Sequence, residues 1–499
     1  MKKVIANNLY FILSIILIVF ESVHIFKGDW IGDFWEHAAV INELSNNLFH
    51  PNNPIIGGNT AHAFFSPYSV LLGLVSKFSH LNSIQVLILF AFINLITLLC
   101  SIHFFCKNIF KTNVPIIASL SLVLILFFWG ENPTSWSGYF HIMALHYMLP
   151  YPSTFAFSLT LILLGLIAKH DLNNLNKYVF LISLIGATIF ITHPTTGIAA
   201  ITSAAIFLFS KNDFDLKIFF KQFLIVFLPL ILLCISWPYY NFLSLFIGDN
   251  SDFQNESMSL YNDLFRQYWP ILLCLPAFLF LKKNKTMFFL LGTQIALIVL
   301  LLIGFEFQLY GLGRIVSYLV MFSHITMSYT LLLAYTNNKL FFRVYFSLLT
   351  AFIYLSTSVN YDALKTVLST CKTPNVKYYY GYNFLRTEVQ PQDIILSDKE
   401  SNWLIPTFGG KVISSVHPLY WVDDLHRRRI DIDLFFKENC PEKVRLYTLK
   451  KYKPKYILIN YNFLKITPED YQQIYKLGKT VYYKKNFRLI EVDQEYLTN

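Results

Sequence analysis

Apolar runs separated by short polar breaks fill the chain from its start to about residue 360. Most of these runs are long enough to cross a hydrocarbon core of about 30 Å, so the pattern predicts membrane-spanning helices. Eleven are predicted, at 8–26, 83–105, 114–130, 153–168, 178–192, 195–210, 218–238, 268–281, 286–304, 313–335 and 341–358. The run at 8–26 is interpreted as an uncleaved anchor rather than a signal peptide, because no small-x-small cleavage site follows it.

The tail from Tyr361 to Asn499 has no run long enough to span a membrane, and its charged residues are frequent. Short apolar stretches alternate there with amphipathic ones, which predicts a small soluble α/β domain. The predicted elements are strands at 393–398, 411–415 and 455–460, a hairpin over 480–492 that turns at Lys485-Asn486, and helices at 431–437 and 442–451. The predicted fold is therefore a polytopic α-helical membrane domain, 1–360, followed by an α/β domain, 361–499.

Charges in the breaks between apolar runs alternate in sign, and this alternation predicts the orientation. With Lys2 and Lys3 inside, every second break is basic, with Lys107, Lys111, Lys169, Lys177, Lys211, Lys217, Lys221, Lys282, Lys283, Lys285, Lys339 and Arg343. The opposite breaks carry Asp29, Asp33, Glu36, Glu43, Glu131, Asp249, Asp252, Glu256, Asp263 and Glu306. The amino terminus is therefore expected in the cytoplasm, and the tail outside. Richness in Lys, Asn, Ile and Phe suggests a bacterial source, hence an inner (plasma) membrane location.

A long outer loop, 27–82, follows the first predicted span. Its segment 68–80 is too short and too interrupted for a span, and counting it as one would place all later lysines outside. We therefore expect an interfacial or re-entrant helix on the outer face.

Composition agrees with a membrane protein: 55% of residues are hydrophobic, only 14% are charged, and the mean hydropathy is +0.47. The net charge of +10 is concentrated in the inside loops and the tail, and no basic repeat or stacking motif points to nucleic acid. The six cysteines form no CxxC or Cys/His metal spacing. Four lie in or beside apolar runs as small hydrophobes, and a disulfide between Cys371 and Cys440 stays open.

The first outer loop holds the leading candidate site. Asp33, Glu36 and His37 are spaced i, i+3 and i+4, so they share one face if this stretch is helical. Asp33 is the residue for which we expect a catalytic role, whereas Glu36 is a bystander or a solvated loop charge. Glu43 and Glu131 are expected to be solvated loop charges.

Other outward-facing polar groups lie far away in sequence. They are His193, which precedes Pro194, and then Glu306, Tyr310 and Arg314 in the loop 304–314. Ionisable groups at membrane depth cost several kcal/mol unless they are paired or hydrated, which makes them functional candidates. The alternatives stay open that His193 caps a helix junction and that Arg314 snorkels to the headgroups.

This layout resembles the GT-C superfamily of integral-membrane glycosyltransferases, which includes protein mannosyltransferases, aminoarabinose transferases and oligosaccharyltransferases. The resemblance is carried by the first-loop stretch Gly32-Asp-Phe-Trp-Glu-His37, by Ser66-Pro67-Tyr68 and by Gly313-Arg314. In the tail it is carried by Leu396-Ser-Asp398, Gly409-Gly-Lys-Val412, His417-Pro418 and Asp424.

The resemblance implies transfer of a sugar from a polyprenyl-phosphate-linked donor to an envelope glycan, lipid or protein on the outer face. Asp33 would be the general base on the acceptor hydroxyl, and Arg314 would bind the phosphate leaving group. His37 would be the second catalytic residue, beside Asp33. His37 and His193 are candidates for phosphate binding or for orienting the acid, and Glu36, Glu306 and Tyr310 for substrate contact. The second outer loop, Glu131–Trp136, lacks the Asp-x-Asp that holds a metal in oligosaccharyltransferases. We therefore expect no cofactor and no obligatory metal, while a divalent ion stays open.

Two other classes of function are alternatives to a glycosyltransferase. A transporter or flippase is expected to show internal repeats and broken helices around a mid-membrane site, whereas the polar groups here gather at one face. A non-enzymatic envelope-assembly protein would use the tail to bind a partner, and Asp33 would then be structural.

Overall fold

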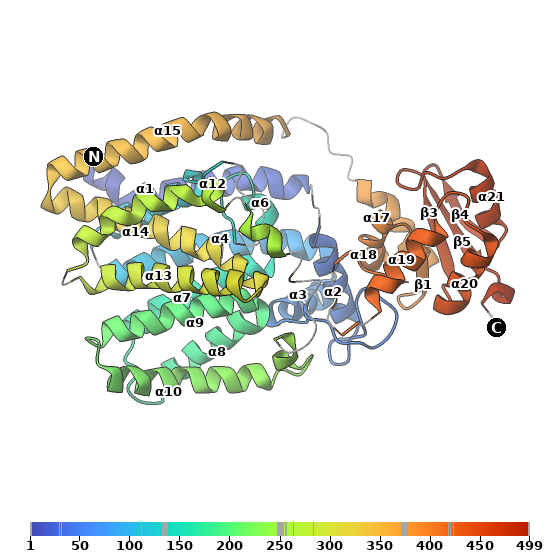
Figure 1. The fold of residues 1–499 in the computed structure, drawn as a ribbon, viewed down its shortest axis with the longest axis horizontal. Helices are drawn as coiled ribbons and strands as arrows, with labels where there is room; N and C mark the ends of the chain where they lie inside the picture. Colours follow the sequence, from blue (N-terminus) through green and yellow to red (C-terminus); the bar gives the residue numbers. More distant parts are fainter. Residues whose placement is uncertain are drawn as a thin grey trace. The chain divides into compact units, whose positions relative to one another are not determined.

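A computed structural model of the 499-residue chain describes residues 2–28, 30, 32–110, 112–131, 138–246, 254, 257–262, 264–282, 284–370, 378–417, 419, 421–422 and 424–497. Contacts divide the chain into two compact units (Figure 1). The helical unit comprises residues 1–28, 88–237 and 241–375, and the loop–tail unit comprises residues 29–87, 238–240 and 376–499. Each unit is described by itself.

Every predicted apolar run coincides with a helix. These are α1 (Lys2–Lys27), α4 (Ser83–Phe110), α5 (Val114–Phe127), α7 (Pro152–Lys169), α8 (Lys177–Thr192), α9 (Pro194–Lys211), α10 (Leu216–Ile235), η3 (Trp269–Phe280), α13 (Lys285–Glu306), α14 (Val316–Asn337) and α15 (Lys339–Thr370). Shorter helices are α6 (Leu145–Met148), η1 (Phe242–Leu245), η2 (Ser259–Tyr261), α12 (Leu264–Tyr268) and η4 (Tyr310–Ile315). The run at 268–281 is a 3₁₀ helix containing Pro270 and Pro276, which cannot donate backbone hydrogen bonds.

Among the described residues, six helices are long and apolar enough to cross a membrane, and three further apolar helices are shorter. The multi-pass membrane character predicted from the sequence is thereby supported, while the count of eleven spans stays a prediction. The most enclosed of these segments, Tyr310–Asn337, contains α14, whose polar side chains find partners inside the unit. His324 Nε2 lies 2.8 Å from the Phe128 carbonyl oxygen, and Gln294 Nε2 donates to Thr326 Oγ1 at 2.8 Å. Such pairing is what polar groups in an apolar bundle require.

The tail contains a five-stranded sheet of order β2-β1-β3-β5-β4, which confirms the predicted α/β domain. Its strands are β1 (Ile394–Ser397), β2 (Lys411–Val412), β3 (Tyr456–Asn460), β4 (Gly478–Lys484) and β5 (Phe487–Val492). Strand β1 pairs in parallel with β2 and β3, and β5 pairs antiparallel with β3 and β4. The hairpin turns where predicted, with Lys485 in the left-handed region at φ 42°.

Helices cover both faces of this sheet. On one face α19 (Leu425–Phe435), α20 (Glu442–Tyr452) and α21 (Pro468–Tyr475) pack against Leu396, Ile457 and Ile490 in one apolar core. Shorter helices of this unit are η5 (Tyr378–Phe384), α16 (Leu385–Glu388), α17 (Lys399–Asn402), α18 (Ile405–Phe408) and η6 (Gln494–Tyr496). Helix α19 begins six residues before the predicted start, because i,i+4 ion pairs such as Arg428–Asp424 support its first turns.

The first outer loop is built into the tail domain. Its helices α2 (Phe34–Asn46) and α3 (Pro67–Ser79) pack together, and a Cβ at Gly73 would lie only 2.7 Å from Leu44 Cβ. The Val412 N–H donates to the Ile55 carbonyl at 2.9 Å, and Ile56 forms a parallel bridge with Val412. The loop thus extends the sheet beyond its edge strand β2. The composition-based division at residue 360 grouped this loop with the membrane domain, whereas packing groups it with the tail, and α15 continues through 360.

Helix α3 covers most of the segment predicted to be interfacial. It buries Tyr68 and Leu72 and exposes Leu71 and Phe78, which are 41% and 77% exposed. This two-sided pattern suits a helix lying on an apolar surface, and its place at the membrane stays a prediction.

A buried ion pair fastens the loop to the sheet, and the prediction of Glu43 as a solvated charge is wrong. Lys411 Nζ donates to Glu43 Oε2 at 2.8 Å and to the Pro54 carbonyl at 3.3 Å. The Asn52 N–H donates to the other carboxylate oxygen of Glu43 at 2.9 Å. Burial lowers the pKa of Lys411, and the neighbouring Glu43 carboxylate only partly offsets this. Since both charges are removed from water, losing either partner leaves the other buried and unpaired.

We predict that Lys411→Met lowers the free energy of unfolding of the loop–tail unit by roughly 3–5 kcal/mol. Thermal unfolding and limited proteolysis of the purified full-length protein measure this. The double variant Glu43→Leu/Lys411→Met should recover part of the loss, because no buried charge is then left alone. The matched control is Glu131→Gln, which removes an acid from the exposed pair Glu131–Arg266, where both side chains are about 60% exposed. Equal effects of Lys411→Met and Glu131→Gln on the free energy of unfolding would contradict the stabilising role of the Glu43–Lys411 pair.

Candidate active site

Asp33 lies at the amino-terminal end of α2, where the predicted spacing forms a helical turn. Its carbonyl accepts a hydrogen bond from the His37 N–H at 2.9 Å, so Asp33, Glu36 and His37 are one turn apart. The preceding Gly32 has φ +60°, a left-handed conformation that glycine adopts without strain. The Trp30 ring stacks on Phe34 with centroids 4.6 Å apart, which fixes how the chain enters the helix.

His417, from the tail, joins two of these residues. Its Nδ1 lies 2.8 Å from Glu36 Oε2, and its Nε2 lies 3.1 Å from Asp33 Oδ1. Ionised carboxylates only accept hydrogen bonds, so both ring nitrogens must carry a proton when both acids are charged. The His417 imidazole therefore bridges the two carboxylates. The Trp403 ring meets this imidazole edge-on, with ring centroids 4.6 Å apart.

A second histidine, His62, reaches Glu36 from the other side. Its Nδ1 accepts a hydrogen bond from the Phe64 N–H at 3.1 Å, so in the neutral ring the proton is on Nε2. That Nε2 lies 3.3 Å from Glu36 Oε1. Both oxygens of Glu36 thus face imidazole nitrogens.

The two acids are in contrasting environments. The Glu36 side chain is 3% exposed, whereas that of Asp33 is 46% exposed. Burial by itself would raise the pKa of Glu36, but the hydrogen bonds to His417 and His62 outweigh it and hold that pKa well below its usual range. The interpretation of Glu36 as a solvated loop charge is therefore wrong, because Glu36 is buried between two histidines. Whether Glu36 is a bystander or contacts substrate stays a prediction. Asp33 is the carboxylate that a substrate can reach.

His37 is enclosed and neutral. It is 6% exposed, and its ring stacks on Phe64 with centroids 4.6 Å apart and planes 13° apart. Burial lowers its pKa to about 4, and the nearby carboxylates of Asp33 and Glu36 only partly offset this. His417 contacts Asp33, and a role for His37 or His193 in orienting this acid stays a prediction. A role for His37 toward phosphate stays a prediction.

The remaining candidates belong to the helical unit. His193 caps α9: its Nδ1 accepts from the Thr196 N–H at 3.3 Å and lies 2.6 Å from Thr196 Oγ1. The alternative that His193 caps a helix junction is therefore confirmed as its local role. Glu306 is the exposed last residue of α13, and Tyr310 and half-buried Arg314 follow in η4. Helix α9 packs against η4 and α13, so these four residues lie on adjoining elements.

No group of three or more His, Cys, Asp or Glu side chains suited to a metal occurs among the residues that the structure describes. The expectation about metal dependence stays untested, since residues 132–137 of the second outer loop lie outside those ranges. Glu131 itself is exposed, as expected, and pairs with Arg266 at 2.8 Å. Cys371 also lies outside the described residues, so its pairing with Cys440 stays open.

Sequence reasoning missed His417, His62 and Lys411 as partners of the first-loop acids. His417 stood in the tail segment that carried the family resemblance, but its distance in sequence from Asp33 gave no sign of a contact. Glu36, Glu43 and His62 lie within one loop, and the run 36–62, which holds two acids and three histidines, was the available signal.

Comparison with known proteins supports the fold. No protein-family model matches the sequence, and no curated protein matches it. Solved structures of the oligosaccharyltransferase of Archaeoglobus fulgidus do match. The form tethered to an acceptor peptide aligns with TM-score 0.55 and 14% identity over 98% of this chain and 75% of that chain. The complex of that enzyme, AglB, with an inhibitory peptide and a dolichol-phosphate aligns with TM-score 0.55 and 13% identity over 92% and 70%. The chain therefore shares its fold with this oligosaccharyltransferase.

The low pKa of His37 gives a pH test of the site. Folded His37 takes up a proton less readily than unfolded His37, so its stabilising contribution is present above about pH 6.5 and is lost as the pH falls to about 4. The loss is on the order of 3 kcal/mol. We predict that His37→Gln flattens this part of the pH dependence of thermal unfolding. His50→Gln, at an exposed histidine of the same loop, should leave this pH dependence unchanged. If the unchanged protein and both variants lost stability equally between pH 6.5 and 4, the loss would not come from His37.

Proposed function

We propose that the protein is a membrane glycosyltransferase that moves a sugar from a polyprenyl-phosphate-linked donor to a cell-envelope acceptor on the outer face. The observation that carries the proposal is the half-exposed Asp33 carboxylate, held by His417 at the start of α2, in a chain with an oligosaccharyltransferase fold. The charge alternation in the loops supports the outward orientation, and composition supports a bacterial inner membrane.

In this proposal Asp33 is the general base. Oδ1 is bound to His417, which leaves Oδ2 for the hydroxyl of the acceptor. As the bond between the anomeric carbon and the donor phosphate breaks, the acceptor oxygen bonds to that carbon and its proton passes to Asp33. The contact with His417 Nε2 fixes the rotamer of Asp33, which holds its other oxygen in place for the proton.

The helical unit would supply the donor site. A guanidinium offers phosphate oxygens several fixed hydrogen bonds, and Arg314 is the candidate, with Tyr310, Glu306 and His193 on adjoining elements. A lipid-linked donor is supported by the AglB structure, which contains a dolichol-phosphate. The peptide bound in that structure makes a polypeptide one candidate acceptor, beside an envelope glycan or lipid.

Replacing Asp33 tests the proposal. Asp33→Asn keeps the size of the side chain but removes the base, so transfer should fall about 10²- to 10⁴-fold. Transfer is measured in membranes as loss of the lipid-linked sugar and its appearance in envelope material, by mass spectrometry. Arg314→Ala should abolish transfer as well. Expression and the elution profile of the detergent-solubilised protein should match those of the natural sequence.

The matched control is Glu131→Gln, which neutralises another acid of the predicted outer loops and should retain full transfer. Full activity of both Asp33→Asn and Arg314→Ala would refute this site. It would favour a transporter or an assembly protein, in which Asp33 is structural. Labelling of the tail by a reagent confined to the cytoplasm would refute the outward orientation.

His417 is predicted to act through Asp33 rather than on the substrate. His417→Leu removes a charged hydrogen bond to Asp33 and should lower transfer on the order of 10- to 100-fold. His417→Gln keeps one N–H donor and should recover part of the loss. Both variants are compared at a temperature at which circular dichroism shows them folded, and wild-type activity in His417→Leu would rule out the positioning role.

A further inference from the structure

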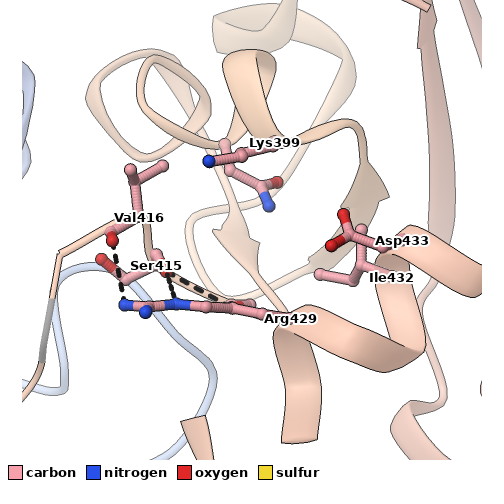
Figure 2. A pocket seen from close by; sticks show the side chains of 8 residues that line it. Lys399, Ser415, Val416, Arg429, Ile432 and Asp433 are labelled. Carbon is pink, nitrogen blue, oxygen red and sulfur yellow. Dashed lines mark hydrogen bonds between the residues drawn. The ribbon is translucent and has the colours of Figure 1, made fainter. Parts of the chain in front are cut away.

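A cavity of about 110 Å³ opens in the tail domain beside the carboxyl ends of β1 and β2 (Figure 2). Lys399 and Asn402 line it from the segment after β1, and Ser415 from the segment after β2. Helix α19 contributes Arg429 and Asp433, and the apolar Ile432 completes the wall. The cavity shares no lining residue with the Asp33 site.

The topology explains why a cavity forms there. From β1 the chain passes through α17 and α18 to β2 on one side, and from β2 it returns past β1 to β3 on the other side. Right-handed crossovers in opposite directions place their helices on opposite faces of the sheet. The loops leaving two adjacent parallel strands therefore diverge, and the crevice between them is where open α/β sheets bind ligands.

Arg429 is fixed at the edge of this crevice. Its Nε donates to the Ser415 carbonyl at 3.0 Å and its Nη2 to the Val416 carbonyl at 2.9 Å. Figure 2 shows both bonds, with the guanidinium lying along the segment that follows β2. Two of the five N–H donors are used in this way, so the cation is pre-oriented and donors remain for a ligand.

The other polar groups complete a donor-rich lining. The Asn402 side chain is 5% exposed, and its Oδ1 accepts from Ser397 Oγ at 2.6 Å, which leaves its amino group as the end for a ligand. Lys399 is exposed at the mouth and adds a second positive charge. Asp433, also exposed, is the lining carboxylate and suits a ligand hydroxyl or ammonium group.

We propose that this cavity binds the anionic group, a carboxylate or a phosphate, of a ligand that carries a neighbouring hydroxyl or ammonium group. Two cations and one amide donor face the anion, while Asp433 accepts from the adjoining group. A cavity of about 110 Å³ is smaller than one that holds a benzene ring, so it takes the charged head of a ligand whose remainder extends outside. Binding there is separate from the sugar transfer proposed above.

Calorimetric titration of the full-length protein in detergent tests the site with three probes: glucuronate, glucose 6-phosphate and glucose. One or both anionic sugars should bind, and glucose should not, so the preferred anion separates a carboxylate from a phosphate ligand. Lys399→Gln should weaken binding of the preferred anion about tenfold. Asp433→Asn should tighten binding of inorganic phosphate, because it removes a like charge beside the anion.

The matched control is Lys443→Gln, which removes an exposed lysine of α20 from the same domain and should leave binding unchanged. Absence of binding by both anionic sugars would overturn the proposal, as would equal binding of glucose. Equal weakening by Lys399→Gln and Lys443→Gln would show a general charge effect and would also overturn it. Transfer is not measured in any arm, so the result does not depend on the role of Asp33.

Discussion

The placement of Asp33 depends on buried electrostatic contacts between the first outer loop and the tail. Glu43 with Lys411, and Glu36 with His417, join residues more than 350 positions apart in the chain. A buried charge is tolerated only when a partner of opposite charge or a strong donor satisfies it. Each pair therefore forms only when the loop lies on the sheet in this one arrangement. Because Asp33 lies at the start of α2 in the same loop, these pairs also set its position.

The contacts between loop and tail also place two neighbouring carboxylates, Glu36 and Asp33, in different environments. Glu36 gives both oxygens to histidines inside the unit, while Asp33 gives one oxygen to His417 and keeps part of its surface open to solvent. A carboxyl group is thus buried at position 36 and open to solvent at position 33, one helical turn away. The tail supplies His417, the third group of the candidate site, so the tail domain takes a direct part in the proposed chemistry.

The two units of the chain hold different groups of the proposed site. The helical unit provides apolar helices and the candidate phosphate-binding arginine, Arg314, and the loop–tail unit provides the candidate base. The parallel part of the tail sheet adds a separate donor-lined cavity beside Arg429. One chain therefore carries a candidate site for a lipid-linked donor, a carboxylate for the acceptor hydroxyl, and a crevice with the charge pattern of an anion site.

The sequence by itself determined the apolar helices, the five strands of the tail, the hairpin turn at Lys485-Asn486 and the helical turn from Asp33 to His37. These features follow from local apolar periodicity and backbone preference, which act over a few residues. Only the tertiary structure decided that the first loop packs with the tail, that Glu36 and Glu43 are buried, and that His417 contacts Asp33. Hydrophobic patterning does not encode which distant residue neutralises a given charge, because that choice is made by burial after the chain has folded.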